Sequence, residues 1–141
     1  MSDIVVDSSV VTKWFLPEVD SAKALDLIPQ TLGQGGRLIV IDLIFPEVAN
    51  AIWKRQRQGL ITPAEGIQFL DALTSSPVHV EPSSPLLSNA YEIATQYDRS
   101  VYDALFVALM QKLNRPGITA DEPLYNTTRK NFPLIQLLRL L

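Results

Sequence analysis

The sequence predicts an α/β domain built on a mainly parallel central sheet. Short apolar runs alternate along the chain with longer segments in which apolar residues recur every three or four positions, the pattern of strands alternating with helices. The apolar runs are continuous rather than mixed with polar residues, as expected of strands that helices cover on both faces. The length of 141 residues fits one domain, so we expect residues 1–141 to fold as a single unit.

Strands are expected where short apolar runs are rich in β-branched residues, because such side chains pack well on a pleated sheet. The segments DIVV, RLIVI and GITA show this most clearly, and VHVE and PLIQL are further candidates. The expected strands are therefore residues 3–6, 37–41, 78–81, 117–120 and 133–137.

Helices are expected in the segments between these runs. The expected helices are residues 9–15, 19–32, 45–58, 62–73, 84–97 and 100–114. The helix 62–73 begins with Thr62 as N-cap, Pro63 in the first position and Glu65 in the third, which is the pattern of a capping box. The helix 100–114 is apolar almost all round, so it should be buried.

Composition narrows the class of protein. Apolar residues make up 47% of the chain and charged residues 19%, an ordinary balance for a globular protein. The absence of cysteine excludes disulfides, thiol catalysis and cysteine metal sites. No signal-peptide pattern and no apolar run of about 18 residues occurs, so we expect a cytoplasmic protein with no membrane partner. The net charge of −3 argues weakly against nucleic-acid binding, unless the acids are gathered in a metal site.

Four acidic residues lie at expected strand ends or helix starts, which should share one edge of such a sheet. Asp7 and Asp121 follow expected strands, and Glu47 and Asp103 lie in the first turns of expected helices. Ligands of open parallel sheets bind outside the carboxyl ends of the strands, so we expect these side chains to converge. Carboxylates brought together must be neutralised or hold cations. Ligand sets made only of oxygen favour Mg²⁺ or Mn²⁺, and such ions commonly serve phosphodiester hydrolysis.

Each acid also has a purely structural interpretation. Asp7 can cap the helix that follows it. Glu47 can be a solvated acid that complements the helix dipole. Asp103 stands three residues after Ser100, as in a capping box, and Asp121 can be a turn residue.

Asp42 has a different expected role, because it directly precedes the helix in the middle of the chain. We expect its side chain to cap a helix over residues 43–58. As a phosphoacceptor, Asp42 would instead suit a receiver-like signalling module. Such a module needs a lysine at a later strand end, and Lys130 lies too far along the chain, so this alternative is disfavoured.

Four segments resemble the PIN-domain family, and most of all its VapC-type toxins. They are IVVDSSVVTKWFLPE (4–18), FPEVANAIWK (45–54), SVYDALFVAL (100–109) and ITAD (118–121), and they lie in the family's order. The resemblance implies a PIN-like three-layer α/β/α fold with an acidic pocket for one or two Mg²⁺ or Mn²⁺ ions. It also implies metal-dependent cleavage of RNA by an endoribonuclease.

The resemblance also assigns roles to individual residues. The catalytic and metal-binding positions of the family are matched here by Asp7, Glu47, Asp103 and Asp121. The family often places a small hydroxyl beside the first acid and another before the last, which Ser8 or Ser9 and Thr119 match in a supporting role. The sequence departs from the family at Pro123, which stands inside a segment that is often a short helix.

Partners are implied by the resemblance as well. VapC-like proteins usually form homodimers, and a cognate antitoxin blocks them by inserting a segment into the active-site cleft. The apolar tail 134–141 is expected to be an edge strand or to cover a partner surface. Two alternatives stay open: an RNA-processing PIN nuclease without an antitoxin, and a catalytically silent module that binds Mg²⁺ or a partner.

Basic residues near the acids are candidates for RNA binding. Lys54 and Arg55 lie near the end of the helix 45–58, where they can complement the helix dipole or contact phosphates of flanking nucleotides. Lys13 is closer to the predicted site and is the stronger candidate. His79, the only histidine, lies far from the acids in sequence, so Ser–His chemistry has no support.

Overall fold

A computed structural model describes residues 2–141 and contains a five-stranded sheet in which all neighbouring strands are parallel. The strand order is β3-β2-β1-β4-β5. The strands are β1 (Ile4–Val6), β2 (Leu38–Ile41), β3 (Val78–Glu81), β4 (Gly117–Thr119) and β5 (Ile135–Leu137). Each strand lies within a range that the sequence predicted, so the expectation of a parallel α/β fold is confirmed.

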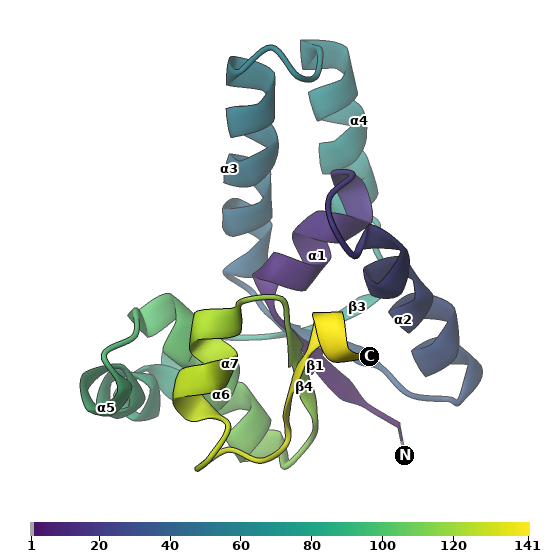
Figure 1. The fold of residues 1–141 in the computed structure, drawn as a ribbon. Helices are drawn as coiled ribbons and strands as arrows, with labels where there is room; N and C mark the ends of the chain where they lie inside the picture. The colour runs from purple at the N-terminus through teal and green to yellow at the C-terminus, as the bar shows by residue number, and fades with distance from the viewer. Residues whose placement is uncertain (1) are drawn as a thin grey trace.

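Seven α-helices surround this sheet in the described part of the chain. They are α1 (Ser8–Phe15), α2 (Ser21–Gly33), α3 (Ile44–Arg57), α4 (Pro63–Thr74), α5 (Leu87–Tyr97), α6 (Val101–Leu113) and α7 (Glu122–Thr128). Two short 3₁₀ turns, η1 (Ser84–Leu86) and η2 (Leu138–Leu140), complete the structure. Figure 1 shows α5, α6 and α7 on one side of the sheet and α1 and α2 on the other, while α3 and α4 project from the sheet as a helical hairpin. None of the helices in residues 2–141 has the length and apolar character needed to cross a membrane.

The core is divided between the two faces of the sheet. Val5 packs in the cluster that includes α5 and α6, whereas its neighbour Val6 packs in the cluster that includes α1, α2 and α3. Ile39 and Val40 of β2 divide in the same way. Successive side chains of a strand point to opposite faces, so a strand covered on both sides must be apolar throughout. This explains the continuous apolar runs and confirms the three-layer arrangement.

The structure confirms the predicted start of α4 and the predicted burial of α6. Thr62 accepts a hydrogen bond from the Glu65 N–H at 3.1 Å, and the Glu65 carboxylate accepts one from the Thr62 N–H at 2.9 Å, which is the predicted capping box. Helix α7 forms despite Pro123, because this proline lies in the first helical turn, where its missing N–H is not needed. The helix α6 is buried along most of its length, as its composition predicted.

The predicted capping role of Asp42 is wrong. Helix α3 has Leu43 as its N-cap and no side-chain cap hydrogen bond. The Asp42 N–H still pairs with the carbonyl of Glu81 at 3.0 Å, so the residue continues the β2–β3 ladder instead of opening the helix. Its side chain accepts a hydrogen bond from the Ser83 N–H at 3.3 Å. The other carboxylate oxygen, Oδ1, is buried and has no hydrogen-bond partner among residues 2–141.

The C-terminal segment forms the edge of the sheet beside β4. β5 pairs with β4 in parallel register, and Leu137 and Leu138 are buried. Leu140 and Leu141 remain exposed. The expectation that this apolar tail contains an edge strand is therefore confirmed.

Candidate active site

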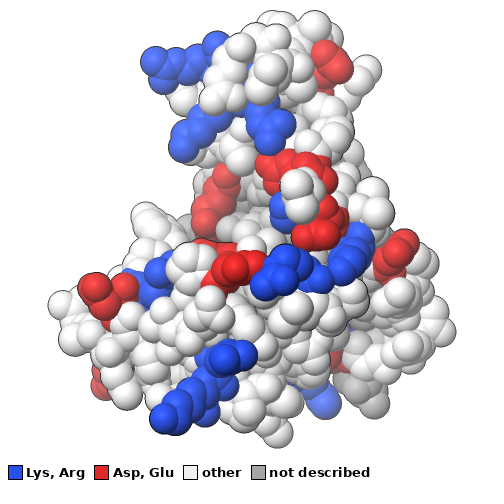
Figure 2. Space-filling model, in the orientation of Figure 1, with Lys and Arg blue, Asp and Glu red and all other residues white. Residues whose placement is uncertain are grey.

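The structure places the four predicted acids at the carboxyl edge of the sheet. Asp7 directly follows β1, and Asp121 follows β4 after one intervening residue. Glu47 and Asp103 lie in the first turns of α3 and α6. Figure 2 shows acidic and basic side chains interleaved across the waist of the molecule, below the α3–α4 hairpin. The sheet topology therefore brings acids that are distant in sequence to one region.

Asp7 is the most constrained of the four. Its Oδ1 atom accepts a hydrogen bond from the Ser8 N–H at 2.9 Å, so it caps α1. Its Oδ2 atom accepts hydrogen bonds from the hydroxyls of Ser9 and Thr119, each at 2.8 Å. The residue is only 8% exposed. Capping and a place in the acidic cluster are thus compatible, and the hydroxyl donors fix the orientation of the carboxylate.

Burial and neighbouring charges act on the protonation of these acids. Burial raises the pKa of Asp7 to about 6, against the opposing effect of its hydrogen-bond donors Ser9 and Thr119, and the charge of Asp103 raises it further. The pKa of Glu47 is also raised, first by burial and then by the charges of Asp7 and Asp103, while its hydrogen bond with Ser8 lowers it. Three of the carboxylates therefore repel one another, and a cation among them would relieve this repulsion.

Small hydroxyl residues connect the parts of the site. The Ser8 hydroxyl donates to Glu47 Oε2 at 3.1 Å and so joins α1 to α3. The Ser9 hydroxyl accepts from the Ala120 N–H at 3.0 Å. The Thr119 hydroxyl accepts from the Asp121 N–H, also at 3.0 Å. The three predicted supporting residues thus all take part in one network.

Replacement of Thr119 by valine is expected to lower the free energy of unfolding by about 1–3 kcal/mol, because the buried Asp7 carboxylate and the partly buried Asp121 N–H each lose a hydrogen bond. Thr119 is fully buried, and valine keeps its shape while removing the hydroxyl. Asp7 would lose a donor and the Asp121 N–H would lose its acceptor. Urea denaturation with EDTA present measures the change.

The matched control is Thr128→Val. Thr128 is equally buried, but its hydroxyl only donates to the carbonyl of Leu124, within α7. Equal losses in the two variants would contradict a special role for the Thr119 hydroxyl.

Asp103 and Asp121 are bridged by Arg99, a residue that the sequence analysis missed. One guanidinium nitrogen, Nη2, lies 2.9 Å from Asp103 Oδ2 and 3.4 Å from Asp121 Oδ2. The Arg99–Asp103 pair has helix spacing, four residues apart, which is a signal that could have been noticed. Asp121 also caps α7 by accepting from the Leu124 N–H at 3.1 Å, and Ser100 caps α6 by accepting from the Asp103 N–H at 3.1 Å.

The four acids therefore form two bridged pairs instead of one tight group. Ser8 bridges Asp7 and Glu47, and Arg99 bridges Asp103 and Asp121. Within residues 2–141, no three acidic or histidine side chains are arranged closely enough to hold one metal ion together. The chemistry of the donor set nevertheless fits Mg²⁺ or Mn²⁺, because every candidate ligand is a carboxylate or hydroxyl oxygen.

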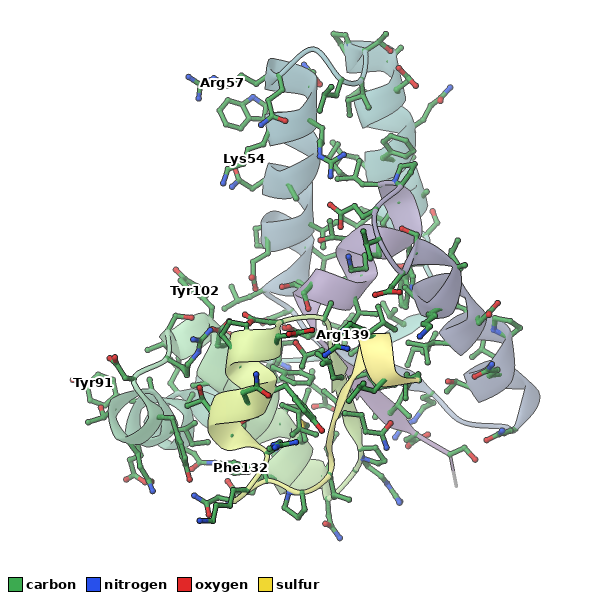
Figure 3. The ribbon with its side chains drawn as sticks, viewed as in Figure 1. Lys54, Arg57, Tyr91, Tyr102, Phe132 and Arg139 are labelled. Atoms are coloured by element: carbon green, nitrogen blue, oxygen red, sulfur yellow. The ribbon has the colours of Figure 1, made fainter. Side chains whose placement is uncertain are left out.

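A small hollow lies beside the first pair. Asp7, Glu47 and Tyr102 line it together with apolar side chains from β1, β2, α3 and α6. Tyr102 directly precedes Asp103 and is mostly exposed, and Figure 3 shows it pointing outward beside α3. An exposed aromatic ring at the edge of a site offers a surface for stacking an unpaired base. No sequence pattern had indicated a role for Tyr102.

The candidate RNA-binding cations occupy different environments. Lys13 and Arg55 both pair with Glu18, at 3.4 Å and 2.6 Å, so this acid partly neutralises them. Lys54 is exposed, and Figure 3 shows it extending from α3 on the same side as Arg57. The Arg57 guanidinium lies over the ring of Trp53 at 5.5 Å from its centroid.

This chain is similar in sequence to a known family and to a known protein. The PIN domain family model matches residues 4–130. Ribonuclease VapC3 of Pyrobaculum aerophilum is 32% identical over 123 residues, which cover 86% of this chain and 91% of that protein.

Solved structures share the fold at lower sequence identity. VapC20 of Mycobacterium tuberculosis, described as a sarcin–ricin loop cleaving toxin, superposes with a TM-score of 0.67 at 17% identity, over 92% of this chain and 96% of that one. A chain of a toxin–antitoxin complex from Klebsiella pneumoniae gives a TM-score of 0.66 at 14% identity, over 96% of this chain and 98% of that one. The family model matches most of this chain, and a VapC ribonuclease is among its relatives. This chain therefore belongs to the PIN-domain family and is VapC-like.

Proposed function

We propose that this protein is a metal-dependent endoribonuclease that acts as the toxin of a toxin–antitoxin pair. The observation that carries the proposal is the meeting of Asp7, Glu47, Asp103 and Asp121 at the carboxyl edge of a parallel sheet. The raised pKa values of Asp7 and Glu47 support it, because they indicate carboxylates that a bound cation would stabilise. The relationship to a protein named as a ribonuclease supports the choice of RNA as substrate.

Each of the four acids has a proposed role as a metal ligand. When bound, one or two Mg²⁺ or Mn²⁺ ions would supply the electrostatic stabilisation and the activated water that phosphodiester hydrolysis needs. The protein's own contribution is to hold Asp7 in one orientation through the hydroxyls of Ser9 and Thr119. Ser8 holds Glu47 in the same manner. Ligands held by such contacts need little reorganisation during the reaction.

RNA would be positioned by cations around this edge. Lys13 and Arg55 are proposed phosphate contacts, and both can exchange Glu18 for a phosphate. Lys54 is exposed on the α3–α4 hairpin, where it suits a nucleotide that flanks the cleaved bond. Such contacts fix the position of the strand without reading its sequence.

The proposed partners follow from the relatives. A solved toxin–antitoxin complex shares this fold, which supports a cognate antitoxin as the partner. We also propose a homodimer, on the basis of the family resemblance, and action in the cytoplasm, where an RNA-cleaving toxin meets its substrate.

The deciding experiment is cleavage of an end-labelled single-stranded RNA with Mn²⁺, Mg²⁺ or EDTA. We expect cutting that requires the metal and leaves 5′-phosphate and 3′-hydroxyl ends. The Asp103→Asn variant should cut at least about 100-fold more slowly, because it loses a charged ligand. Asp71→Asn makes the same chemical change on an exposed position of α4 and should cut normally. Equal cutting by the Asp103→Asn variant would contradict the proposed site.

A further inference from the structure

We propose that Arg99 is an internal counterion that occupies the Asp103–Asp121 pair in the metal-free protein and competes with the divalent cation for it. The inference rests on the proposed metal-dependent function. It goes further by assigning to a residue of the chain itself the control of metal loading. We expect a divalent cation to displace Arg99 from its ion pairs with Asp103 and Asp121.

The geometry places one positive group between two proposed metal ligands. A single nitrogen of Arg99 contacts the Oδ2 atoms of both Asp103 and Asp121, at 2.9 Å and 3.4 Å. The arginine side chain is 22% exposed, so the contact is partly shielded from water. A cation held by both carboxylates would therefore compete with Arg99 for them.

The backbone holds Arg99 in this position. Asp98 ends α5 in the left-handed conformation with φ 52°, and the Arg99 N–H donates to the carbonyl of Ala94 at 3.1 Å. Ser100 then caps α6. Arg99 therefore lies in a connection fixed at both ends by packed helices, with its side chain directed at the acids.

Arg99 and a divalent cation cannot both keep these contacts. Like charges within a few ångströms repel strongly, and a divalent ion carries twice the charge of a guanidinium. The present arrangement also separates the four acids into two pairs, so that no three of them in residues 2–141 form a single ion site. Binding of a metal by both Asp103 and Asp121 would thus require Arg99 to withdraw.

The bonding of Arg99 also favours its release. Its Nε atom is buried and has no hydrogen-bond partner among residues 2–141. An unpaired buried N–H makes the bridged state less stable than a fully bonded arginine would be. A side chain with this exposure can reach water when a cation takes its place.

The test compares Mn²⁺ binding, measured by isothermal titration calorimetry, in the unaltered protein and in Arg99→Gln. We expect Arg99→Gln to bind Mn²⁺ about 3- to 10-fold more tightly, since the competing charge is gone. The matched control, Arg57→Gln, removes the same charge from the far end of α3 and should bind Mn²⁺ like the unaltered protein.

Thermal unfolding gives a second readout. With EDTA present, Arg99→Gln should melt at a lower temperature than the unaltered protein, because two neighbouring carboxylates lose their counterion. Saturating Mn²⁺ should remove this difference or reverse it. Arg99→Lys, which keeps the charge but not the planar guanidinium, should bind Mn²⁺ close to the unaltered protein, and this separates the effect of the charge from that of the side-chain shape.

Two outcomes would overturn the inference in distinguishable ways. If Asp103→Asn abolishes Mn²⁺ binding but Arg99→Gln binds as the unaltered protein does, or more weakly, then Arg99 does not compete with the metal and the proposed function still stands. If the unaltered protein binds no Mn²⁺, the proposed function itself fails and the inference fails with it.

Discussion

The Asp7→Asn variant is expected to lose RNA cleavage by at least about 100-fold and, in EDTA, to be more stable than the unaltered protein by about 1–3 kcal/mol near pH 7.5. The loss of activity follows from the proposed role of Asp7 as a metal ligand. The gain in stability follows from its burial, because an ionised carboxylate is held there without a cation. Asparagine removes the charge and keeps the size of the side chain.

The dependence on pH has a defined sign. Burial raises the pKa of Asp7 from 3.8 to about 6 in the folded protein, so folding favours the protonated form. The stability that Asp7 contributes is thus fully present below about pH 4 and is lost as pH rises through about 6. Urea denaturation in EDTA between about pH 4 and 8 should show this decline in the unaltered protein and a smaller decline in Asp7→Asn.

Both the unaltered protein and Asp7→Asn should still lose some stability as pH rises, because the pKa of Glu47 is also raised. The difference between the two curves therefore isolates Asp7. If the stability of the two proteins changed equally with pH between about pH 4 and 8, the raised pKa of Asp7 would be contradicted. Restored stability of the unaltered protein on addition of Mn²⁺, but not of the variant, would add support for a cation at this carboxylate.

The Leu109→Ala variant is expected to lower the free energy of unfolding by about 3–4 kcal/mol, since it leaves a cavity in the core. Leu109 is fully buried in the cluster between the sheet and α5, on the helix that also carries Asp103. Poorer packing of α6 should also weaken cleavage, because Asp103 loses its fixed position.

The control for this variant is Leu60→Ala. Leu60 is 64% exposed beyond the end of α3, so its truncation should change stability by no more than about 0.5 kcal/mol. A small effect of Leu109→Ala in chemical denaturation would show that α6 contributes less to the core than its burial indicates.

Local patterns were sufficient for most of the elements. The two-sided apolar runs predicted the strands, and the Thr62–Glu65 pair predicted the start of α4, because both depend on neighbours close in sequence. Asp42 shows where such reasoning fails. An acid before a helix is a good capping candidate by local preference, but pairing of β2 with β3 continues to Asp42 and leaves Leu43 at the cap.

The place of the acids was predicted in outline from one rule of parallel sheets. Asp7 and Asp121 follow strands that end at the same edge, and the structure places them there. Their direct partners could not be predicted in the same way. Arg99 contacts Asp121 across 22 positions of sequence, and Glu18 contacts Arg55 across 37. Such contacts depend on the packing of helices that no local pattern describes.

The sequence by itself determined the strands, six of the seven α-helices and the place of the four acids at the edge of the sheet, because hydrophobic periodicity and the parallel-sheet rule act through residue type and spacing. Only the tertiary structure decided that the acids form two bridged pairs, one held by Ser8 and the other by Arg99. The physical reason is distance: side-chain contacts between separate helices are set to within an ångström by how the core packs, and that packing is a property of the whole chain.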